Sequence, residues 1–251
     1  MAIIALKAWY LEQYEPISQI VRRSHDLRLS KNSLLKAGLR ADFLDDRAEV
    51  EASNWFGRYL EGETIEFYIE GSGGYAISNI DLVSHEIYFT KQDTSAFTEP
   101  AIYFSQQTEI PEATETIREV LEETVAQLSA RSRLPLALEL AQRPQNAPLR
   151  LSSSQLRKIR KSLLFIADST PVARAGEEQL LVSPNVCVEL GYALQNKRAG
   201  QMLLVRQERL AGQIPFDLAN HQQLSFKTAT ELQKTLPDVV ETLLSRFKLL
   251  S

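Results

Sequence analysis

The second half of the chain alternates between short apolar runs and longer segments in which apolar residues recur at helical spacing. The apolar runs predict strands at residues 101–105, 134–141, 163–168, 201–205 and 224–226. The segments between them predict helices at residues 113–131, 152–161, from 184 onward and 228–248. Strands that are apolar along their whole length and alternate with helices indicate a parallel sheet with both faces covered, so we predict an α/β fold here.

The first part of the chain follows a different pattern. Residues 11–40 show helical spacing, whereas residues 65–70 alternate between apolar and polar side chains and residues 86–90 are again typical of a strand. The glycine-rich residues 71–75 lead into strand-like residues rather than a helix, so they predict a hairpin turn and not a dinucleotide-binding loop. We therefore predict an α+β domain, whose role its sequence does not indicate.

A polar stretch at residues 91–100, which ends in a proline, separates the two patterns. Domain boundaries tend to fall in polar, proline-containing segments of this kind. We therefore predict two domains, an α+β domain over residues 1–98 and an α/β domain over residues 99–251.

Composition and charge exclude several classes of protein. The 44% hydrophobic and 24% charged residues are typical of a globular protein, and a net charge of −4 gives no broad attraction to nucleic acid. The single cysteine, Cys187, excludes an intrachain disulfide and a multi-cysteine zinc site and fits a reducing cytosol. The three histidines lie far apart and no segment has the ~20 apolar residues of a membrane span. We expect a soluble, cytoplasmic protein without a metal.

One carboxylate, Glu189, interrupts the apolar run at residues 183–194. Ser183 followed by Pro184 is typical of a helix N-cap and first helical position. On the predicted helix, polar side chains recur at steps of four, three and four, so they share one face: Asn185, Glu189, Tyr192 and Asn196. Gly191, which costs about 1 kcal/mol in a helix relative to alanine, is expected to let a ligand or neighbouring backbone come close.

The end of each predicted strand indicates where a ligand would bind. In open parallel sheets, ligands bind beyond the carboxyl ends of the strands, near the point where the strand order reverses. Ser105, Asp168 and the helix that starts at Pro184 would meet there. A half-buried Glu189 in such a crevice should have its pKa raised by desolvation, unless a hydrogen bond or a cation compensates.

Three strings in this region resemble the signatures of bacterial TIR-like predicted nucleotide-binding proteins. They are Asp-Ser-Thr at 168–170, Ser-Pro-Asn-Val-Cys-Val-Glu-Leu-Gly-Tyr-Ala at 183–193 and Ile-Pro-Phe-Asp-Leu at 214–218. That family is similar to the nucleoside 2-deoxyribosyltransferases, whose signature also ends in glutamate, an apolar residue, glycine, tyrosine and alanine. The resemblance covers about residues 100–251 and implies a flavodoxin-like sheet that holds a nucleoside or a nicotinamide dinucleotide.

The resemblance also implies a role for individual residues. Glu189 would act at the anomeric carbon of the sugar, Asp168 would lie near the ribose, and the pocket would be lined by Phe104 and Ser105. Further substrate contacts are expected from Asn185, Tyr192, Phe216 and Asp217. The implied reaction is cleavage of the N-glycosidic bond of NAD or a related nucleotide, with no cofactor besides that ligand. Sites of the TIR type often need self-association, so a homo-oligomer is implied as well.

The sequence departs from the transferases at one point and leaves alternatives open. Ser-Pro-Asn-Val stands at 183–186 where the transferases usually carry Asp-x-Gly-Thr, which argues against base exchange on deoxynucleosides. Glu189 could instead complement its helix dipole or pair with a buried arginine. Asp168 could cap its loop, and ordinary local or packing roles stay open for Asn185, Tyr192, Phe216 and Asp217. The domain could also be a nucleotide sensor without turnover, or a protein-interaction module.

Overall fold

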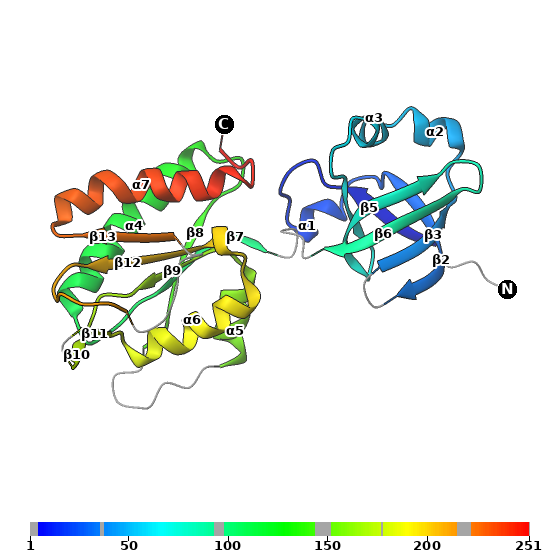
Figure 1. Cartoon of the computed structure of the whole chain (residues 1–251). Coiled ribbons are helices and arrows are strands. Elements are labelled where there is room, and N and C mark those ends of the chain that lie inside the picture. Colours follow the sequence, from blue (N-terminus) through cyan, green and yellow to red (C-terminus); the bar gives the residue numbers. More distant parts are fainter. Residues whose placement is uncertain are drawn as a thin grey trace. The chain divides into compact units, whose positions relative to one another are not determined.

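The computed structural model describes residues 5–35, 38–92, 98–143, 152–176, 178–214 and 222–250. The chain divides into two compact units, residues 1–97 and 98–251, and buried apolar side chains form a core in each (Figure 1). Among the described helices, none is long and apolar enough to cross a membrane.

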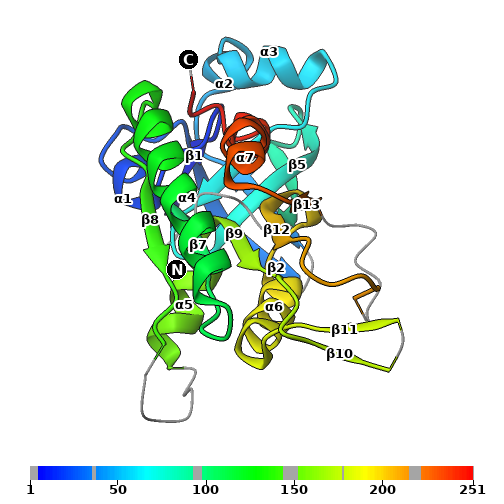
Figure 2. The ribbon, with the colours of Figure 1, turned by 90° about the vertical axis from the view of Figure 1, so that its left-hand side faces the viewer.

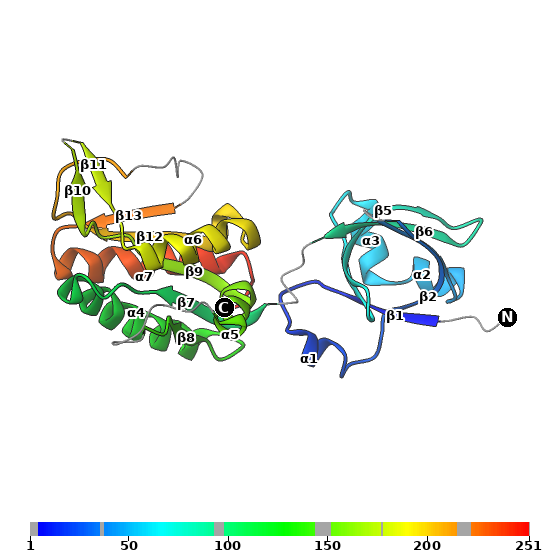
Figure 3. The ribbon, with the colours of Figure 1, turned by 90° about the horizontal axis from the view of Figure 1, so that it is seen from below.

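The first unit is a closed antiparallel barrel of six strands in the order β1-β2-β3-β6-β5-β4, seen in Figure 3. Its strands are β1 (Ala5–Tyr10), β2 (Leu27–Leu35), β3 (Gly38–Phe43), β4 (Glu66–Ile69), β5 (Gly73–Asp81) and β6 (Glu86–Gln92). Its helices are short: α1 (Ile17–Ile20), α2 (Arg47–Glu51) and α3 (Asn54–Leu60).

The hairpin predicted from the glycine-rich residues 71–75 is confirmed. Strands β4 and β5 pair antiparallel on either side of it, with Tyr68 opposite Gly74. Gly71 and Gly73 have φ angles of 68° and 119°, which side chains other than glycine rarely adopt. The predicted strands at residues 65–70 and 86–90 are likewise confirmed as β4 and β6.

The helical spacing of residues 11–40 does not correspond to helical structure over most of that stretch. Among its described residues only the four of α1 are α-helical, and β2 and β3 occupy residues 27–35 and 38–43. Leu27 and Leu29 are buried in the barrel core while Arg28 between them is exposed, so the alternation is that of a strand. The first unit is therefore mainly β, and cross-strand pairing overrides the local helical spacing.

The second unit contains a five-stranded sheet in which every neighbouring pair is parallel. The sheet order is β13-β12-β9-β7-β8, from β7 (Glu99–Ser105), β8 (Ala137–Leu140), β9 (Ser162–Asp168), β12 (Met202–Gln207) and β13 (Gln222–Phe226). Figure 1 shows one face covered by α4 (Pro111–Arg131) and α7 (Ala229–Ser245), and the other by α5 (Ser153–Lys161) and α6 (Pro184–Asn196). The predicted α/β architecture is confirmed.

Two local features of this unit differ from the sequence predictions. A short hairpin, β10 (Ala173–Ala175) with β11 (Gln179–Leu181), was not predicted and extends from the unit beside α6 (Figure 2). Ser183 is the N-cap residue of α6, but its side chain does not cap the helix. Its hydroxyl donates instead to Oε1 of Glu109 over 3.0 Å.

The strand order sets the place of a candidate site. Numbered along the chain, the five strands lie in the order 2-1-3-4-5, so the direction of winding reverses between β7 and β9. Ser105 is the last residue of β7 and Asp168 is the last residue of β9. Since Ser105 lies opposite Ala167, both side chains lie at the carboxyl edge of the sheet, where open α/β sheets bind ligands.

Candidate functional site

Glu189 lies on the inner face of α6, completely buried. Val186, Leu190 and Ala193 from the same helix are also buried, in the core that α6 forms with the sheet. Of the four polar residues predicted to share one face of α6, Glu189 alone is fully buried. Asn185 and Tyr192 are half-buried, while Asn196 is exposed and its side-chain amide donates to the carbonyl of Tyr192.

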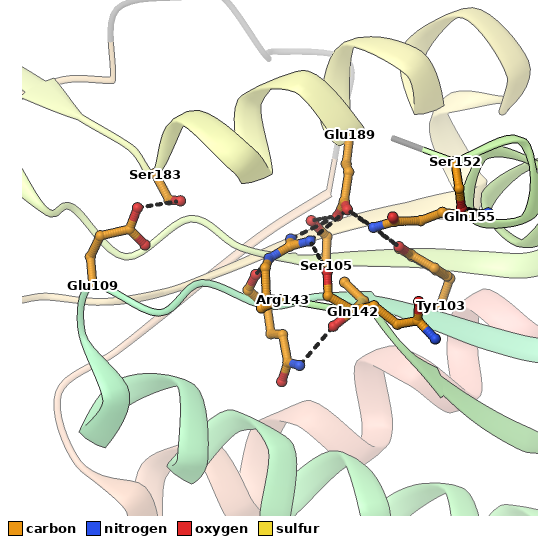
Figure 4. A network of polar contacts seen from close by, with 11 residues as sticks. Tyr103, Ser105, Glu109, Gln142, Arg143, Ser152, Gln155, Ser183 and Glu189 are labelled. Carbon is orange, nitrogen blue, oxygen red and sulfur yellow. Dashed lines mark hydrogen bonds and ion pairs between the residues drawn. The ribbon is translucent and has the colours of Figure 1, made fainter. Parts of the chain in front are cut away.

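Four side chains converge on the carboxylate of Glu189 (Figure 4). Arg143 forms a bidentate ion pair, with Nη1 2.7 Å from Oε1 and Nη2 2.9 Å from Oε2. The hydroxyl of Ser105 donates to Oε2 over 2.5 Å, and the amide of Gln155 donates to Oε1 over 2.5 Å. The hydroxyl of Tyr103 lies 3.4 Å from Oε1. Both carboxylate oxygens are thus engaged by donors from β7, from α5 and from the segment that follows β8.

The geometry of the secondary structure explains why these side chains meet. Tyr103 and Ser105 are two residues apart on β7, so they point to the same face of the sheet, the face that α5 and α6 cover. Gln155 is in the first turn of α5, which begins at an N-cap formed by Ser152. Arg143 follows the carboxyl end of β8, the strand beside β7.

Arg143 is itself held firmly in the interior. Its Nε donates to the carbonyl of Gln106 over 2.8 Å, and its side chain is only 5% exposed. A buried carboxylate would be strongly destabilised without a counter-charge, and the planar guanidinium supplies one with two parallel hydrogen bonds. The sequence analysis allowed for a cation that compensates the burial of Glu189, and Arg143 is that cation. The same ion pair matches the alternative that Glu189 pairs with a buried arginine.

Asp168 is a second fully buried carboxyl group, in a different environment. Its Oδ2 accepts from the hydroxyl of Thr114 over 2.6 Å, and its Oδ1 accepts from the backbone N–H of Thr170 over 3.0 Å. Within the described residues, no cation forms an ion pair with it. Burial raises the pKa of Asp168, and the hydrogen bonds from Thr114 and Thr170 offset this only in part.

Among the predicted site residues that the structure describes, only Ser105 forms a hydrogen bond with Glu189. Phe104 is fully buried, and because it alternates with Tyr103 and Ser105 along β7 it points to the opposite face of the sheet. Phe216 and Asp217 lie outside the described residues.

Sequence reasoning missed Arg143, Gln155 and Tyr103. A signal existed for Arg143, because it follows a predicted strand directly and the carboxyl ends of strands are where site residues collect. Tyr103 could have been found from its step of two from Ser105. Nothing in the sequence pairs Gln155 with Glu189, since they are 34 residues apart on different helices.

Comparison with known proteins adds little. No family model matches the chain, and no curated protein matches it. Among solved structures, the chain is similar to the CMP N-glycosidase BcmB of Clostridium botulinum, with 16% sequence identity over 54% of this chain and 97% of that one. The TM-score is 0.31, which is too low to establish a common fold or activity. The functional argument therefore rests on the residues themselves.

Proposed function

We propose that the second unit binds a nucleotide at the carboxyl ends of β7 and β9 and cleaves its N-glycosidic bond, with NAD as the first candidate. The observation that carries the proposal is Glu189, a buried carboxylate oriented by Ser105, Gln155 and Arg143 at the point where the strand order reverses. The resemblance of residues 183–193 to TIR-like nucleotide-binding proteins supports the same reading.

The chemistry of this bond suits an oriented carboxylate. As the bond from C1′ to the base nitrogen breaks, positive charge develops on the sugar, and a carboxylate can stabilise that charge or form a covalent bond to C1′ that water then hydrolyses. In NAD the nicotinamide nitrogen is cationic, so it takes the bonding electrons and leaves as a neutral molecule. No general acid is therefore required to protonate the departing nicotinamide. This suits the site, because the groups that contact Glu189 are hydroxyl, amide and guanidinium groups and none is a second carboxylic acid.

The ion pair with Arg143 defines the resting state in this proposal. Both oxygens of Glu189 accept hydrogen bonds, so a sugar can contact the carboxylate only after Arg143 withdraws. Ser105 and Gln155 would then continue to orient it, since each bonds a different oxygen. Arg143 thus acts as an intramolecular competitor of the sugar for the carboxylate.

The first test is release of nicotinamide from NAD by the purified full chain. We expect the Glu189→Gln variant to lose at least about 100-fold in rate, because the developing positive charge then has no anionic partner. Activity should be followed over a range of protein concentrations, since the resemblance to TIR-type sites implies self-association. Equal rates for the variant and the parent protein would refute the assignment of Glu189.

A control is needed for folding, because Glu189→Gln leaves Arg143 buried without its counter-ion. Breaking a buried ion pair on one side typically costs about 3–5 kcal/mol. The double variant Glu189→Gln, Arg143→Gln removes both charges and should regain most of the free energy of unfolding. If it is folded by circular dichroism and still releases no nicotinamide, the loss of activity belongs to Glu189 and not to unfolding.

The ion pair also favours a second candidate, a nucleotide sensor that does not turn over its ligand. In that case Arg143 and Glu189 stay paired, and their role is to hold α6 and the end of β8 together. Calorimetric binding of NAD with no nicotinamide released, at any protein concentration, would select this candidate.

A further inference from the structure

A second feature lies at the same edge of the sheet, beyond the carboxyl end of β12. It is a cavity of about 330 Å³ whose lining includes Pro171, Leu180, Arg206, Glu208, Arg209 and Gly212. None of the residues that line it contacts the carboxylate of Glu189, so it is distinct from the network in Figure 4. Strand β12 is the neighbour of β9, and Val205 lies opposite Asp168.

The walls of this cavity are fixed by backbone hydrogen bonds. On the inner side, the N–H of Gln207 donates to the hydroxyl of Thr170 over 3.0 Å. On the outer side, Gln213 exchanges two bonds with the β10–β11 hairpin, from its N–H to the carbonyl of Glu178 (2.7 Å) and from the N–H of Leu180 to its carbonyl (2.8 Å). A side chain at Gly212 would come within 2.6 Å of the carbonyl of Glu178, so the loop closes there only with glycine.

Two arginines, Arg206 and Arg209, line the cavity. The Nε of Arg206 donates to the hydroxyl of Ser225 over 2.9 Å, which anchors the guanidinium group, and among the described residues its two amino nitrogens have no partner. Among the described residues, no carboxylate pairs with Arg206 or Arg209. Glu208 also lines the cavity, but its carboxylate lies 3.8 Å from the ammonium of Lys227, which offsets its charge.

We infer that this cavity binds the phosphate or pyrophosphate group of a nucleotide through Arg206 and Arg209. A cavity lined by two arginines that pair with no described carboxylate favours an anion, and the planar donors of a guanidinium group match phosphate oxygens. The nucleotide part of this inference rests on the proposed function, because the sugar of the same ligand would then reach toward Glu189. The site would accept nucleotides and discriminate against nucleosides.

The test is calorimetric titration of the full chain with three probes: inorganic pyrophosphate, ADP and adenosine. We expect Arg206→Gln and Arg209→Gln together to weaken the binding of pyrophosphate and of ADP at least about tenfold, because the charge-assisted hydrogen bonds to the anion are lost. Arg157→Gln, which removes an exposed arginine from α5 in the same unit, is the matched control and should leave both affinities unchanged. If Arg206→Gln unfolds the protein, Arg209→Gln alone still tests the site, because Arg209 is exposed and its replacement should leave the fold intact.

Each outcome decides between specific alternatives. Failure of pyrophosphate to bind, or equal affinity in the double variant and the parent protein, would overturn the anion site. Binding of pyrophosphate without ADP would overturn its assignment to a nucleotide. Pyrophosphate binding that is lost in the arginine variants, in a protein that releases no nicotinamide from NAD, would uphold the cavity and count only against the proposed reaction.

Discussion

At the scale of single residues, the second unit stabilises its two buried carboxyl groups, Glu189 and Asp168, with different kinds of partner. The carboxylate of Glu189 pairs with the guanidinium group of Arg143, whereas that of Asp168 accepts hydrogen bonds from Thr114 and Thr170 and, among the described residues, pairs with no cation. The two carboxyl groups face opposite sides of the sheet, since Asp168 bonds Thr114 of α4 whereas Glu189 lies on α6 beside α5. In the proposed reaction, Glu189 is the carboxylate that acts on the sugar. Burial raises the pKa of Asp168 and so favours its neutral form.

The environment of Asp168 predicts the effect of Asp168→Asn. Its raised pKa means that the folded state binds the proton more tightly than the unfolded state, so stability falls as pH rises from the ordinary carboxyl pKa to the raised one. An asparagine at this position can accept the hydrogen bond from the Thr170 N–H and donate one to the hydroxyl of Thr114. That hydroxyl can in turn donate to the carbonyl of Gln107, which lies 3.3 Å from it. We expect the variant to be more stable than the parent protein at pH 7 and to lose this pH dependence.

Urea denaturation at several pH values between 4 and 8 measures this effect. Asp168→Ala is the control, because it leaves the Thr170 N–H unsatisfied and should be roughly 1–3 kcal/mol less stable than Asp168→Asn at every pH. If Asp168→Asn destabilises the fold at pH 7 as much as the alanine variant does, the carboxyl group is charged in the folded state and its environment has been misread.

At the scale of elements, α6 combines a buried face that carries Glu189 with an exposed face that carries Gly191. The sequence led us to expect a close approach of ligand or backbone at Gly191. A Cβ placed there has no heavy atom within 4 Å, so the helix carries the glycine without a packing reason in this state.

Gly191→Ala should therefore stabilise the protein by about 1 kcal/mol, the difference in helix propensity between the two residues. The melting temperature measures the change. Gly38→Ala is the opposite control, because its Cβ would lie 2.6 Å from the carbonyl of Phe89 in the barrel and should destabilise. A lower melting temperature for Gly191→Ala would show that something does approach this position in solution.

At the scale of the whole molecule, the two units have separate cores and different chemistry. The barrel core contains aromatic residues such as Trp55 and Phe67, while the polar network and the cationic cavity both belong to residues 98–251. A unit with its own core can in principle fold alone.

Residues 98–251 expressed alone should therefore fold and retain the pyrophosphate affinity of the full chain within about threefold. Circular dichroism and a cooperative urea transition test the folding, and calorimetry tests the binding. An unfolded or aggregated fragment would show that the barrel supplies contacts on which the second unit depends.

Much of the architecture follows from the sequence because its signals are local. The apolar run at 163–167, followed by Asp168, became the central strand β9, and the serines at 152–154 start α5, since strand burial and helix capping depend on adjacent residues. The hairpin at residues 71–75 was predictable for the same reason, because glycine adopts positive φ angles without a steric cost.

The sequence by itself determined the alternation of strands and helices in the second unit, and it singled out Glu189 as a carboxylate that packing does not explain. The tertiary structure decided what Glu189 contacts. Arg143 is 46 residues away, and the two meet because β8 lies beside β7 under α5 and α6. Likewise, barrel closure converted residues 27–35 from an expected helix into a strand. Pairings of this kind join residues that are distant in the chain, so no local pattern encodes them.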